Sequence, residues 1–504
     1  MNTTKIIYRT FLVGSFVAIN TLIIYGISAS WNFLNTGADR SKMLHLTQKL
    51  ELAYLPKMHW DLDGQKGRPM NKQALKELEA DYRSAWYVKN MAFRNNDPFG
   101  LDDFFTKSAK AELLALLNLN IQNGVSQRST TITHHIQLEF YSLDGKMAIL
   151  TDHMVTGYQE TYQRGELTYA GPTQNSYRVM LLLEDGFWRI RQMIKTKGEE
   201  VIVKPTQVGI SIGALKGINY YPKSHPWEMF GKHHDPAILD ADFMKLKLMG
   251  FNSIRIFIPY ETFGRAHVDE TQLKQILELM DIAAEKDLKV LITLFDFFGE
   301  YDMAHWTLAH RHAEKLVTTL KGHRALLGWD IKNEPDLDFD NYGKREVLTW
   351  LELMINRLRE WDDVHPITIG WSTPEAAVSL KEMVDFISFH YYGPLEEFDN
   401  RFSVLREKAK GKSMVLQEFG KSSYKGIWNA YMGSDEAQLE YMRGIKKRLD
   451  ANDLSFYIWT LHDFENIPNK VVGPRPWRKA HQRNFGLLDV LGKEKPVSTL
   501  GWGN

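Results

Sequence analysis

The sequence has 504 residues, of which 44% are apolar and 25% charged, the balance of a globular protein rather than a disordered or fibrous one. Its 62 basic residues equal its 62 acidic residues, so no net charge attracts nucleic acid or an anionic surface. The absence of cysteine excludes disulfides, thiolate metal sites and cysteine nucleophiles. The length allows two or more domains.

The first predicted element is an apolar segment. Residues 10–28 contain no charged side chain and approach the ~20 residues that a membrane-spanning helix needs. We therefore expect residues 1–30 to be a retained membrane anchor. A cleaved signal peptide is the alternative, because Ser28-Ala29-Ser30 is a small-x-small site. Both interpretations export the rest of the chain, so we expect the folded domains to be periplasmic or extracellular.

A stalk and a small domain are predicted next. Residues 31–70 are expected to form the stalk, which is polar and partly helical from Ser41 to Gly67. Residues 71–200 show two helical patterns and then alternating runs typical of β-strands. We expect helices near 75–89 and 109–120, and strands at 131–141, 146–158, 176–183 and 188–195. Helices followed by an antiparallel meander predict an α+β domain.

The closing motif of this domain is Asp185-Gly186-Phe187-Trp188-Arg189-Ile190. Together with the order of elements, it resembles the nuclear-transport-factor-2-like cone. The resemblance implies a pocket or a dimerisation module, and hence a protein partner for residues 71–200. The domain also contains His134, His135 and His153, which we expect to be ordinary strand residues, because no acid is spaced to complete a metal site.

The region 208–504 alternates short apolar runs with helical patterns, which predicts βα units and a parallel sheet. The strands are expected at 217–221, 253–258, 289–294, 327–331, 367–369, 386–389, 414–416 and 456–460, with helices at 240–249, 271–285 and 345–361 among those between them. Eight such units predict an α/β fold of the (β/α)8 TIM-barrel type. A doubly wound sheet would require a glycine-rich phosphate turn after an early strand, and the sequence has none.

Two glutamates come directly after apolar strands of this barrel. The fourth strand leads into Asn333-Glu334-Pro335, and the seventh into Glu418. Catalytic side chains of TIM barrels lie at the C-terminal ends of strands. A carboxylate placed there is costly unless it has partners or a function. We therefore expect Glu334 and Glu418 to face each other across the barrel mouth.

These positions resemble clan A glycoside hydrolases, which carry their two carboxylates on strands four and seven. Within the clan the pattern is most similar to family five, the cellulase and mannanase family. The matching positions are Gly217–Pro222 on the first strand, Arg255 on the second, Asn333-Glu334-Pro335 on the fourth, His390 and Tyr392 on the sixth, Glu418 on the seventh and Trp459 on the eighth. The resemblance covers the chain from about Val208 to the C-terminus.

One position departs from the family pattern. Family five usually has a histidine near the end of strand three, where this chain has Asp296. The segment from Asn484-Phe485-Gly486 to Lys495-Pro496 is also similar to the closing segment of clan A family two.

The resemblance implies a retaining glycoside hydrolase that cleaves a β-linked polysaccharide of the β-glucan or β-mannan type by double displacement. Glu418 is then the nucleophile and Glu334 the acid/base, with the two carboxyls about 5–5.5 Å apart. Arg255 is expected to keep Glu418 ionised. The other expected substrate-binding residues are Asn333, His390, Tyr392, Trp459, Asp296 and Trp371, while His462 and Asp463 also lie at a strand end and either line the cleft or cap it.

Two alternatives use the same barrel. A transglycosylase would have the same site with a sugar acceptor in place of water. A catalytically silent barrel would bind glycan in an envelope polysaccharide assembly, with Glu334, Glu418 and Arg255 forming a structural ion network. We expect a polysaccharide or oligosaccharide as substrate, contact with the membrane through the N-terminal helix, and no nucleic-acid partner.

No metal ion or organic cofactor is expected. His305, His310 and His312 lie on one segment, but they lack an i, i+4 pair followed by a suitable third ligand. We therefore expect a solvated, partly amphipathic helix there. The basic run Arg443, Lys446, Lys447 and Arg448 is most simply explained as favourable charge near a helix C-terminus.

Overall fold

The computed structural model describes residues 50–196, 209–210 and 212–503, with a few isolated positions between 14 and 23. The predicted anchor, residues 1–30, lies almost entirely outside this part, as does the predicted stalk before residue 50. Within the part described, no helix has both the length and the apolar character of a membrane span.

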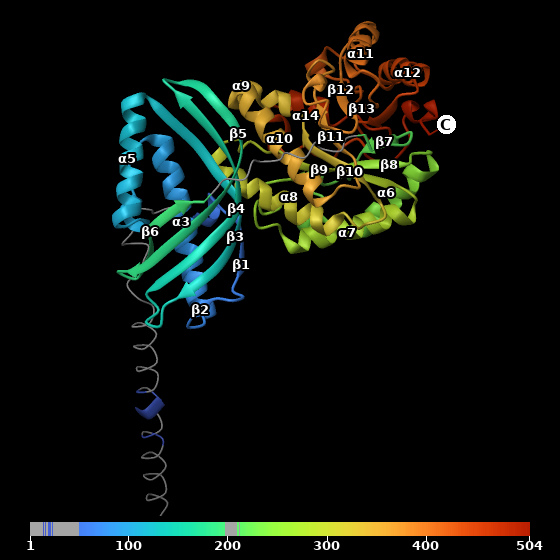
Figure 1. The fold of residues 1–504 in the computed structure, drawn as a ribbon. Helices are drawn as coiled ribbons and strands as arrows, with labels where there is room; N and C mark the ends of the chain where they lie inside the picture. Colours follow the sequence, from blue (N-terminus) through green and yellow to red (C-terminus); the bar gives the residue numbers. More distant parts are fainter. Residues whose placement is uncertain are drawn as a thin grey trace, which may run out of the picture.

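The described residues form an N-terminal sheet domain and a C-terminal barrel (Figure 1). The helices of the sheet domain are α3 (Lys72–Asn95), α4 (Leu101–Phe104) and α5 (Lys107–Asn123). Its strands are β1 (Lys57–Asp61), β2 (Lys66–Gly67), β3 (Val125–Tyr141), β4 (Met147–Gln163), β5 (Glu166–Glu184) and β6 (Phe187–Lys195). The helices and strands predicted within residues 71–200 are confirmed, and several are longer than predicted.

The predicted stalk is partly wrong. Instead of a polar connection, residues 57–67 contribute β1 and β2, which both pair with β3 in parallel. The side chains of β1 are intermediate or exposed, so the strand shows no run of buried apolar residues. Its pairing depends on the open edge of β3, a tertiary contact that sequence periodicity does not reveal.

The barrel is closed in the order β7 to β14, and each of the eight predicted strands is confirmed. The strands are β7 (Lys216–Asn219), β8 (Ser253–Pro259), β9 (Lys289–Asp296), β10 (Leu326–Asn333), β11 (Ile367–Trp371), β12 (Ile387–Tyr391), β13 (Met414–Phe419) and β14 (Ser455–Ile458). The helices are α6 (Pro236–Leu248), α7 (Glu270–Glu285), α8 (Trp306–Leu320), α9 (Phe339–Tyr342), α10 (Lys344–Trp361), α11 (Leu395–Ala409), α12 (Asp435–Asn452), α13 (Asn469–Val472) and α14 (Pro476–Gln482).

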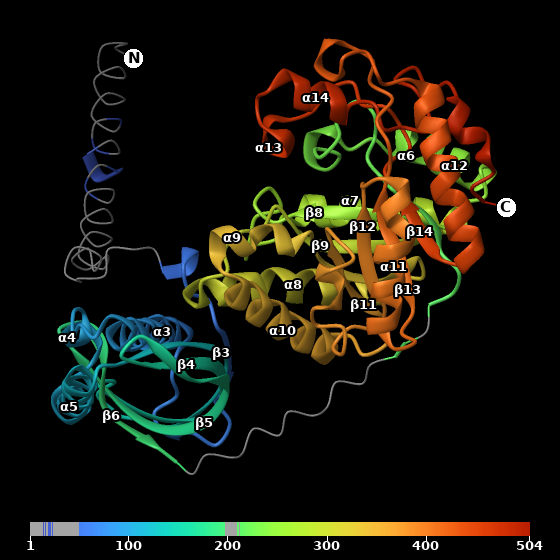
Figure 2. The same cartoon turned by 90° about the horizontal axis from the view of Figure 1, so that it is seen from above.

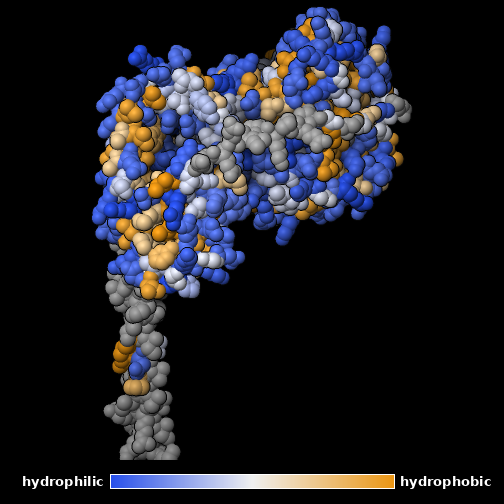
Figure 3. Space-filling model, viewed as in Figure 1, coloured by the Kyte–Doolittle hydropathy of each residue, from blue (hydrophilic) through white to orange (hydrophobic). Residues whose placement is uncertain are grey.

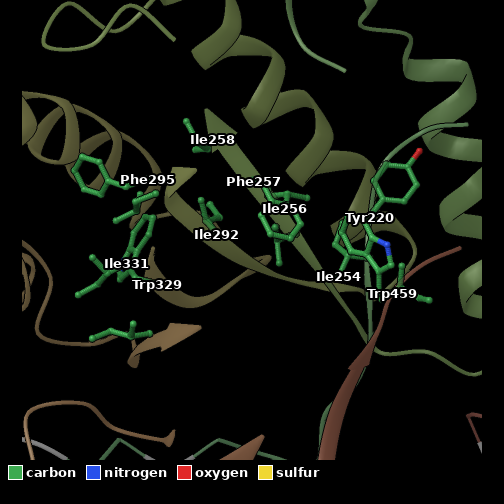
Figure 4. Close-up of a cluster of buried hydrophobic side chains, with 14 of the residues drawn as sticks. Tyr220, Ile254, Ile256, Phe257, Ile258, Ile292, Phe295, Trp329, Ile331 and Trp459 are labelled. Carbon is green, nitrogen blue, oxygen red and sulfur yellow. The ribbon is translucent and has the colours of Figure 1, made fainter. Parts of the chain in front are cut away.

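Local sequence signals explain where several barrel helices begin. The carboxylate of Asp235 accepts from two amides of α6, whose first residue is Pro236. Asp269 caps α7 in the same way, and Ser434 caps α12. Such caps satisfy amides that have no partner within the helix. Between strands and helices lies one apolar core, in which Ile254, Ile256 and Phe257 of β8 pack beside strand and loop residues (Figure 4).

The two domains share an interface. One face of the sheet packs against α3 and α5, and the other meets α8 of the barrel (Figures 1 and 2). Ile132 of β3 is fully buried in the barrel's hydrophobic cluster, and Tyr158 of β4 packs against Trp306 with ring centroids 5.2 Å apart. Arg94 of α3 donates two hydrogen bonds to Asp302, at 2.7 and 2.6 Å. Because Asp302 comes after β9, the interface reaches the rim of the barrel face where strands end.

The sheet domain contains a buried polar chain, which we call the sheet-domain network. The hydroxyls of Tyr54 and Thr131 share a hydrogen bond, and Thr131 Oγ1 lies 2.8 Å from His134 Nε2. Asp152 Oδ2 is 2.6 Å from His134 Nδ1 and accepts from the Tyr82 hydroxyl at 2.8 Å. His134 is therefore a strand residue as predicted, but it has an acid partner that its spacing in the sequence did not reveal.

Candidate active site

The two glutamates lie where the sequence predicted, at the C-terminal ends of β10 and β13. Glu334 comes directly after β10, where Pro335 begins the 3-10 turn Pro335–Asp338, and its φ of 48° is in the left-handed region. A non-glycine residue held in that region is strained, and such strain is concentrated at functional sites. The Glu334 amide donates to the carbonyl of Gly370 at 2.7 Å, which fixes the turn against β11.

The carboxyl groups of Glu334 and Glu418 are close together. One oxygen of each, with a ring nitrogen of His390, lie within 4.8 Å of one another. The two carboxyls therefore face one small space, which is compatible with the separation of about 5–5.5 Å in retaining glycosidases.

Glu418 accepts hydrogen bonds on both carboxylate oxygens. The Tyr392 hydroxyl donates to Oε1 at 2.7 Å, and Arg255 Nη1 lies 3.3 Å from Oε2. Both contacts favour the ionised form of Glu418. They agree with the partners predicted for it from the sequence.

Arg255 is fully buried and donates hydrogen bonds to more than one partner. Its closest is Asp330, whose Oδ2 accepts from Nη2 at 2.6 Å and from Nε at 3.0 Å. Arg255 Nη2 also donates to Asn333 Oδ1 at 2.8 Å. Because this fixes the amide oxygen of Asn333, its NH₂ group is left to face the pocket that Asn333 lines. The charge of Arg255 is thus divided between Asp330 and Glu418.

His390 connects the two glutamates. Its Nδ1 lies 2.9 Å from Glu334 Oε1 and 3.9 Å from Glu418 Oε2. Gly370 lies beside the ring: a Cβ there would come within 2.4 Å of Gln417 Oε1 and 2.8 Å of Arg255 Nη2. Only glycine therefore allows β11 to approach this cluster so closely.

The protonation of the cluster is set by these contacts. Burial and the neighbouring charge of Glu334 raise the pKa of Glu418, while His390, Arg255 and Tyr392 oppose that rise. Burial also acts to raise the pKa of Glu334, but hydrogen bonding and charge from His390 outweigh it and lower that pKa. Burial lowers the pKa of His390, yet the two carboxylates together raise it above its usual 6.5.

Protons are therefore shared within the Glu334–His390–Glu418 group. Because each of the three groups lies beside another, their protons are lost in steps that belong to the group as a whole. An acid/base at Glu334 and a nucleophile at Glu418 would require a proton on Glu334 beside an ionised Glu418.

The two glutamates open into a hollow of about 400 Å³. Its walls include Tyr221, Phe257, Asp296, Asn333, Tyr392, Trp459 and Phe485. The mixture of aromatic faces and convergent polar groups is typical of a small-molecule site. Trp459 packs against Trp227 with centroids 5.6 Å apart, so its ring is held in place before any ligand binds.

Asp296 is the most unusual wall residue. It is 5% exposed, and its carboxyl group interacts with the hydroxyl of the buried Tyr221. Burial raises the pKa of Asp296 to about 6, against the opposing charges of Lys332, Arg255 and Lys470. The indole nitrogen of Trp459 is buried without a partner in the described part of the chain.

Some predicted residues lie elsewhere. Trp371 is 1% exposed and is absent from the lining of the hollow, because its ring packs in the core near Phe339. His462 and Asp463 are also buried, His462 beside Asp242 at 2.9 Å and Asp463 beside Lys495 at 3.2 Å. These last two residues cap the barrel rather than line the hollow.

Three supporting residues were missed by the sequence analysis: Asn219, Thr293 and Asp330. Asn219 Oδ1 accepts from Arg255 Nη1 at 3.0 Å, and Thr293 Oγ1 from Arg255 Nε at 3.0 Å. Thr293 also donates to Asp330 Oδ2 at 2.7 Å. The signal available was a polar residue within a mostly apolar strand, which does not indicate its partner.

Two groups of side chains in the described residues converge closely enough to hold a cation. One is Glu334, His390 and Glu418, the cluster described above; the other is His225, Glu228 and His233 on the loop after β7. The rings of His225 and His233 stack with centroids 3.6 Å apart. Two imidazoles bound to one ion by bonds of about 2.0–2.1 Å stand further apart, so this pair does not form a preformed site.

The histidines of α8 do not converge either. His312 Nδ1 lies 2.8 Å from the carbonyl of Arg265, and His310 packs against the ring of Trp361. Both are buried, which corrects the prediction of a solvated helix at this point.

Sequence comparison relates the barrel to known glycoside hydrolases. Residues 215–465 match the sequence profile of the family described as Cellulase (glycosyl hydrolase family 5). The β-glucuronidase of Homo sapiens is 23% identical over 303 residues, 55% of this chain and 43% of that protein. The β-glucuronidase of Rattus norvegicus is 24% identical over 312 residues, 56% of this chain and 43% of that one. The chain thus spans less than half the length of these curated relatives.

Among solved structures, the exo-β-1,4-mannosidase of Opitutaceae bacterium strain TAV5 is 20% identical, with a TM-score of 0.47. That match covers 60% of this chain and 61% of the mannosidase.

Proposed function

We propose that the barrel is a clan A glycoside hydrolase domain and that the chain is a retaining β-glycosidase acting on a β-linked polysaccharide of the β-glucan or β-mannan type. The observation that carries the proposal is the closeness of Glu334 and Glu418 beneath one hollow, with donors to both oxygens of Glu418.

The first step forms a glycosyl-enzyme ester. A carboxylate oxygen of Glu418 attacks the anomeric carbon, and the bond from that carbon to the leaving oxygen breaks. Glu334 gives its proton to the leaving oxygen. The Tyr392 hydroxyl and Arg255 hold Glu418 in place, so little reorganisation is needed as its charge moves into the new bond.

The second step reverses the roles. Glu334, now ionised, takes a proton from water while the water oxygen attacks the anomeric carbon. The ester bond to Glu418 breaks and its carboxylate is restored. His390 Nδ1, 2.9 Å from Glu334 Oε1, holds that carboxyl group in place in both steps. Two displacements at one carbon give retention of the anomeric configuration.

We propose that Asn333, Asp296 and Trp459 bind the sugar whose bond is cleaved. The NH₂ group of Asn333 is available for the 2-hydroxyl, a contact that strengthens in the transition state. Asp296 Oδ2 can accept from a further hydroxyl, and the face of Trp459 is the floor of the subsite.

The test is a reducing-end assay across β-glucans, β-mannans, chitosan and aryl β-glucuronides, followed by NMR of the first product. We expect hydrolysis of at least one β-glycan, with the β-anomer appearing first. Initial release of the α-anomer would contradict double displacement. Absence of turnover on every substrate would instead favour the silent glycan-binding barrel, and transfer to added sugar acceptors would favour a transglycosylase.

We also propose that residues 1–30 tether the enzyme to a membrane, with both folded domains on the outer side. The proposal rests on the length and the lack of charge of residues 10–28 in the sequence. Protease added to intact cells should digest the barrel while the mature protein keeps its N-terminus. Protection of the barrel would contradict the orientation, and a mature chain beginning near Trp31 would contradict the tether.

A further inference from the structure

A second hollow adjoins the catalytic one. It measures about 460 Å³ and is lined by two segments, the loop between β13 and α12 and the stretch after β14 that contains α13 and α14. Val471, Val472, His481 and Gln482 line both hollows, so the two are continuous. Hollows of this size, about 300–1,000 Å³ each, are typical of ligand sites.

Two tryptophans form the outer part of this second hollow. Trp428 and Trp477 are 53% and 42% exposed, and their ring centroids lie 5.7 Å apart at an interplanar angle of 49°. Exposed tryptophan is costly unless its ring is covered in the functional state. Flat indole faces beside a sugar-cleaving site offer the apolar surface on which the C–H faces of a pyranose can pack.

Hydrogen bonds join the two segments to each other. Ser422 Oγ donates to the carbonyl of His481 at 2.7 Å, and the Ser423 amide donates to the carbonyl of Asn484 at 2.8 Å. Within the first loop, the Gly426 amide donates to Asn429 Oδ1 at 3.1 Å. The tryptophans are therefore held in a fixed relation before a ligand arrives, which reduces the entropy lost on binding.

Ring contacts connect these two segments to Glu418, the proposed nucleophile. His481 packs edge-on against Phe485 with centroids 5.2 Å apart, and Phe485 packs against Tyr392 at 6.0 Å. Tyr392 in turn donates to Glu418. A glycan held on the tryptophans would thus lie along one wall of the hollow in which its bond is cleaved.

We propose that Trp428 and Trp477 form an additional sugar subsite, which binds a further residue of the β-linked glycan chain cleaved at Glu334 and Glu418. The inference rests on the proposed function and narrows it: the preferred substrates are chains long enough to span both hollows. Small aryl glycosides occupy only the catalytic hollow.

The competing explanation is a docking surface for a protein or a lipid, because Ile427, Tyr431 and Met432 on the same loop are also exposed. These three residues do not line the second hollow. The continuity of the hollow with the catalytic site favours the glycan, and Ile427 supplies a matched control.

The experiment compares Trp428→Ala, Trp477→Ala and the double variant with Ile427→Ala in the full chain. Substrates are cellohexaose and mannohexaose, together with the aryl β-glycoside of the same sugar. We expect kcat/KM for the preferred hexasaccharide to fall about tenfold per tryptophan and to remain unchanged for the aryl glycoside. Trp477→Phe should keep most of the activity, because it retains an aromatic face.

A binding arm separates this inference from the proposed function. The same substitutions are made in the Glu418→Gln chain, and the affinity for both hexasaccharides is measured by calorimetry. Loss of affinity with the tryptophans but not with Ile427 supports the subsite even if no turnover is found in the wild type. Equal losses on long and short substrates, no loss on either, or an effect of Ile427→Ala matching that of the tryptophans would overturn it.

Discussion

Two of the buried histidine–carboxylate networks among the described residues differ in their surroundings. In the barrel, His390 joins Glu334 and Glu418 beneath an open hollow. In the sheet-domain network, His134 lies between Thr131 and Asp152, and both His134 and Asp152 are fully buried. The surface over the domains is largely hydrophilic in the view of Figure 3. A hydrogen-bonded histidine and acid therefore indicate chemistry only where a ligand can reach them.

The two networks also differ in what they connect. Around the barrel site, His390 lies between Glu334 and Glu418, and both glutamates line the hollow. In the sheet domain, the ring nitrogens of His134 both have protein partners, and Tyr82 adds a donor to Asp152. The first network borders the hollow, whereas the second joins β3, β4 and α3.

The largest effect is expected at the nucleophile. Glu418→Gln should lower kcat by about 10³-fold or more, because the amide cannot form the ester intermediate. The matched change in the other network, Asp152→Asn, should leave kcat of the folded enzyme unchanged. Steady-state kinetics on the preferred β-glycan checks both. Near-normal turnover by the Glu418 variant would mean that the nucleophile is another residue.

The reverse order is expected for stability. His134→Ala removes the group between Thr131 and Asp152 and leaves buried polar atoms unpaired, so the free energy of unfolding of the sheet domain should fall by about 3 kcal/mol. Glu418→Gln, at the edge of a hollow, should have a much smaller effect. Denaturant titration followed by circular dichroism measures both variants. An unchanged denaturation midpoint in His134→Ala would show that the network does not stabilise the domain.

The pH profile of kcat/KM should be bell-shaped. Activity should rise as Glu418 loses its proton, with a midpoint above 4.5 because its pKa is raised. It should fall as the last proton leaves the Glu334–His390 pair, above 6.5 because the pKa of His390 is raised. In His390→Asn the rising limb should move to higher pH, since the positive charge that lowers the pKa of Glu418 is lost. A profile with its rising limb below 4.5 would contradict the shared-proton description.

The smallest effect is expected at the interface between the two regions. Arg94→Ala removes a two-pronged ion pair with Asp302, but both side chains are partly exposed. Such pairs contribute about 0–1 kcal/mol, so thermal stability should change little and kcat should not change. Differential scanning calorimetry measures this. Separate unfolding of the two domains in Arg94→Ala would show that the ion pair contributes more to the interface than this range.

The parts of the fold that repeat were predictable, and those that depend on distant contacts were not. Alternation of strands and helices indicated all eight barrel strands, because each unit buries the same kind of apolar face. β1 was missed, because its five residues are paired only through β3. At the site, Glu334 and Glu418 could be predicted from their places after strands, since the barrel brings those ends together.

The supporting contacts required the structure. Asp330 takes the strongest contacts of Arg255, yet nothing in its local sequence distinguishes it from any acid within a strand. Trp371 shows the opposite case, a residue at a strand end whose side chain points into the core. Strand position places a Cα at the barrel mouth, but packing decides which way the side chain points.

The central claim is that Glu418 forms a covalent bond with the sugar, and trapping this intermediate tests it most directly. The full chain would be incubated with 2-deoxy-2-fluoro β-glycosyl fluorides of glucose, mannose and glucuronic acid, then digested and analysed by mass spectrometry. We expect one reagent to add a single glycosyl group to the peptide containing Glu418 and to none in Glu418→Gln. A glycosyl group on any other residue, in an enzyme that turns over β-glycans, would contradict the account.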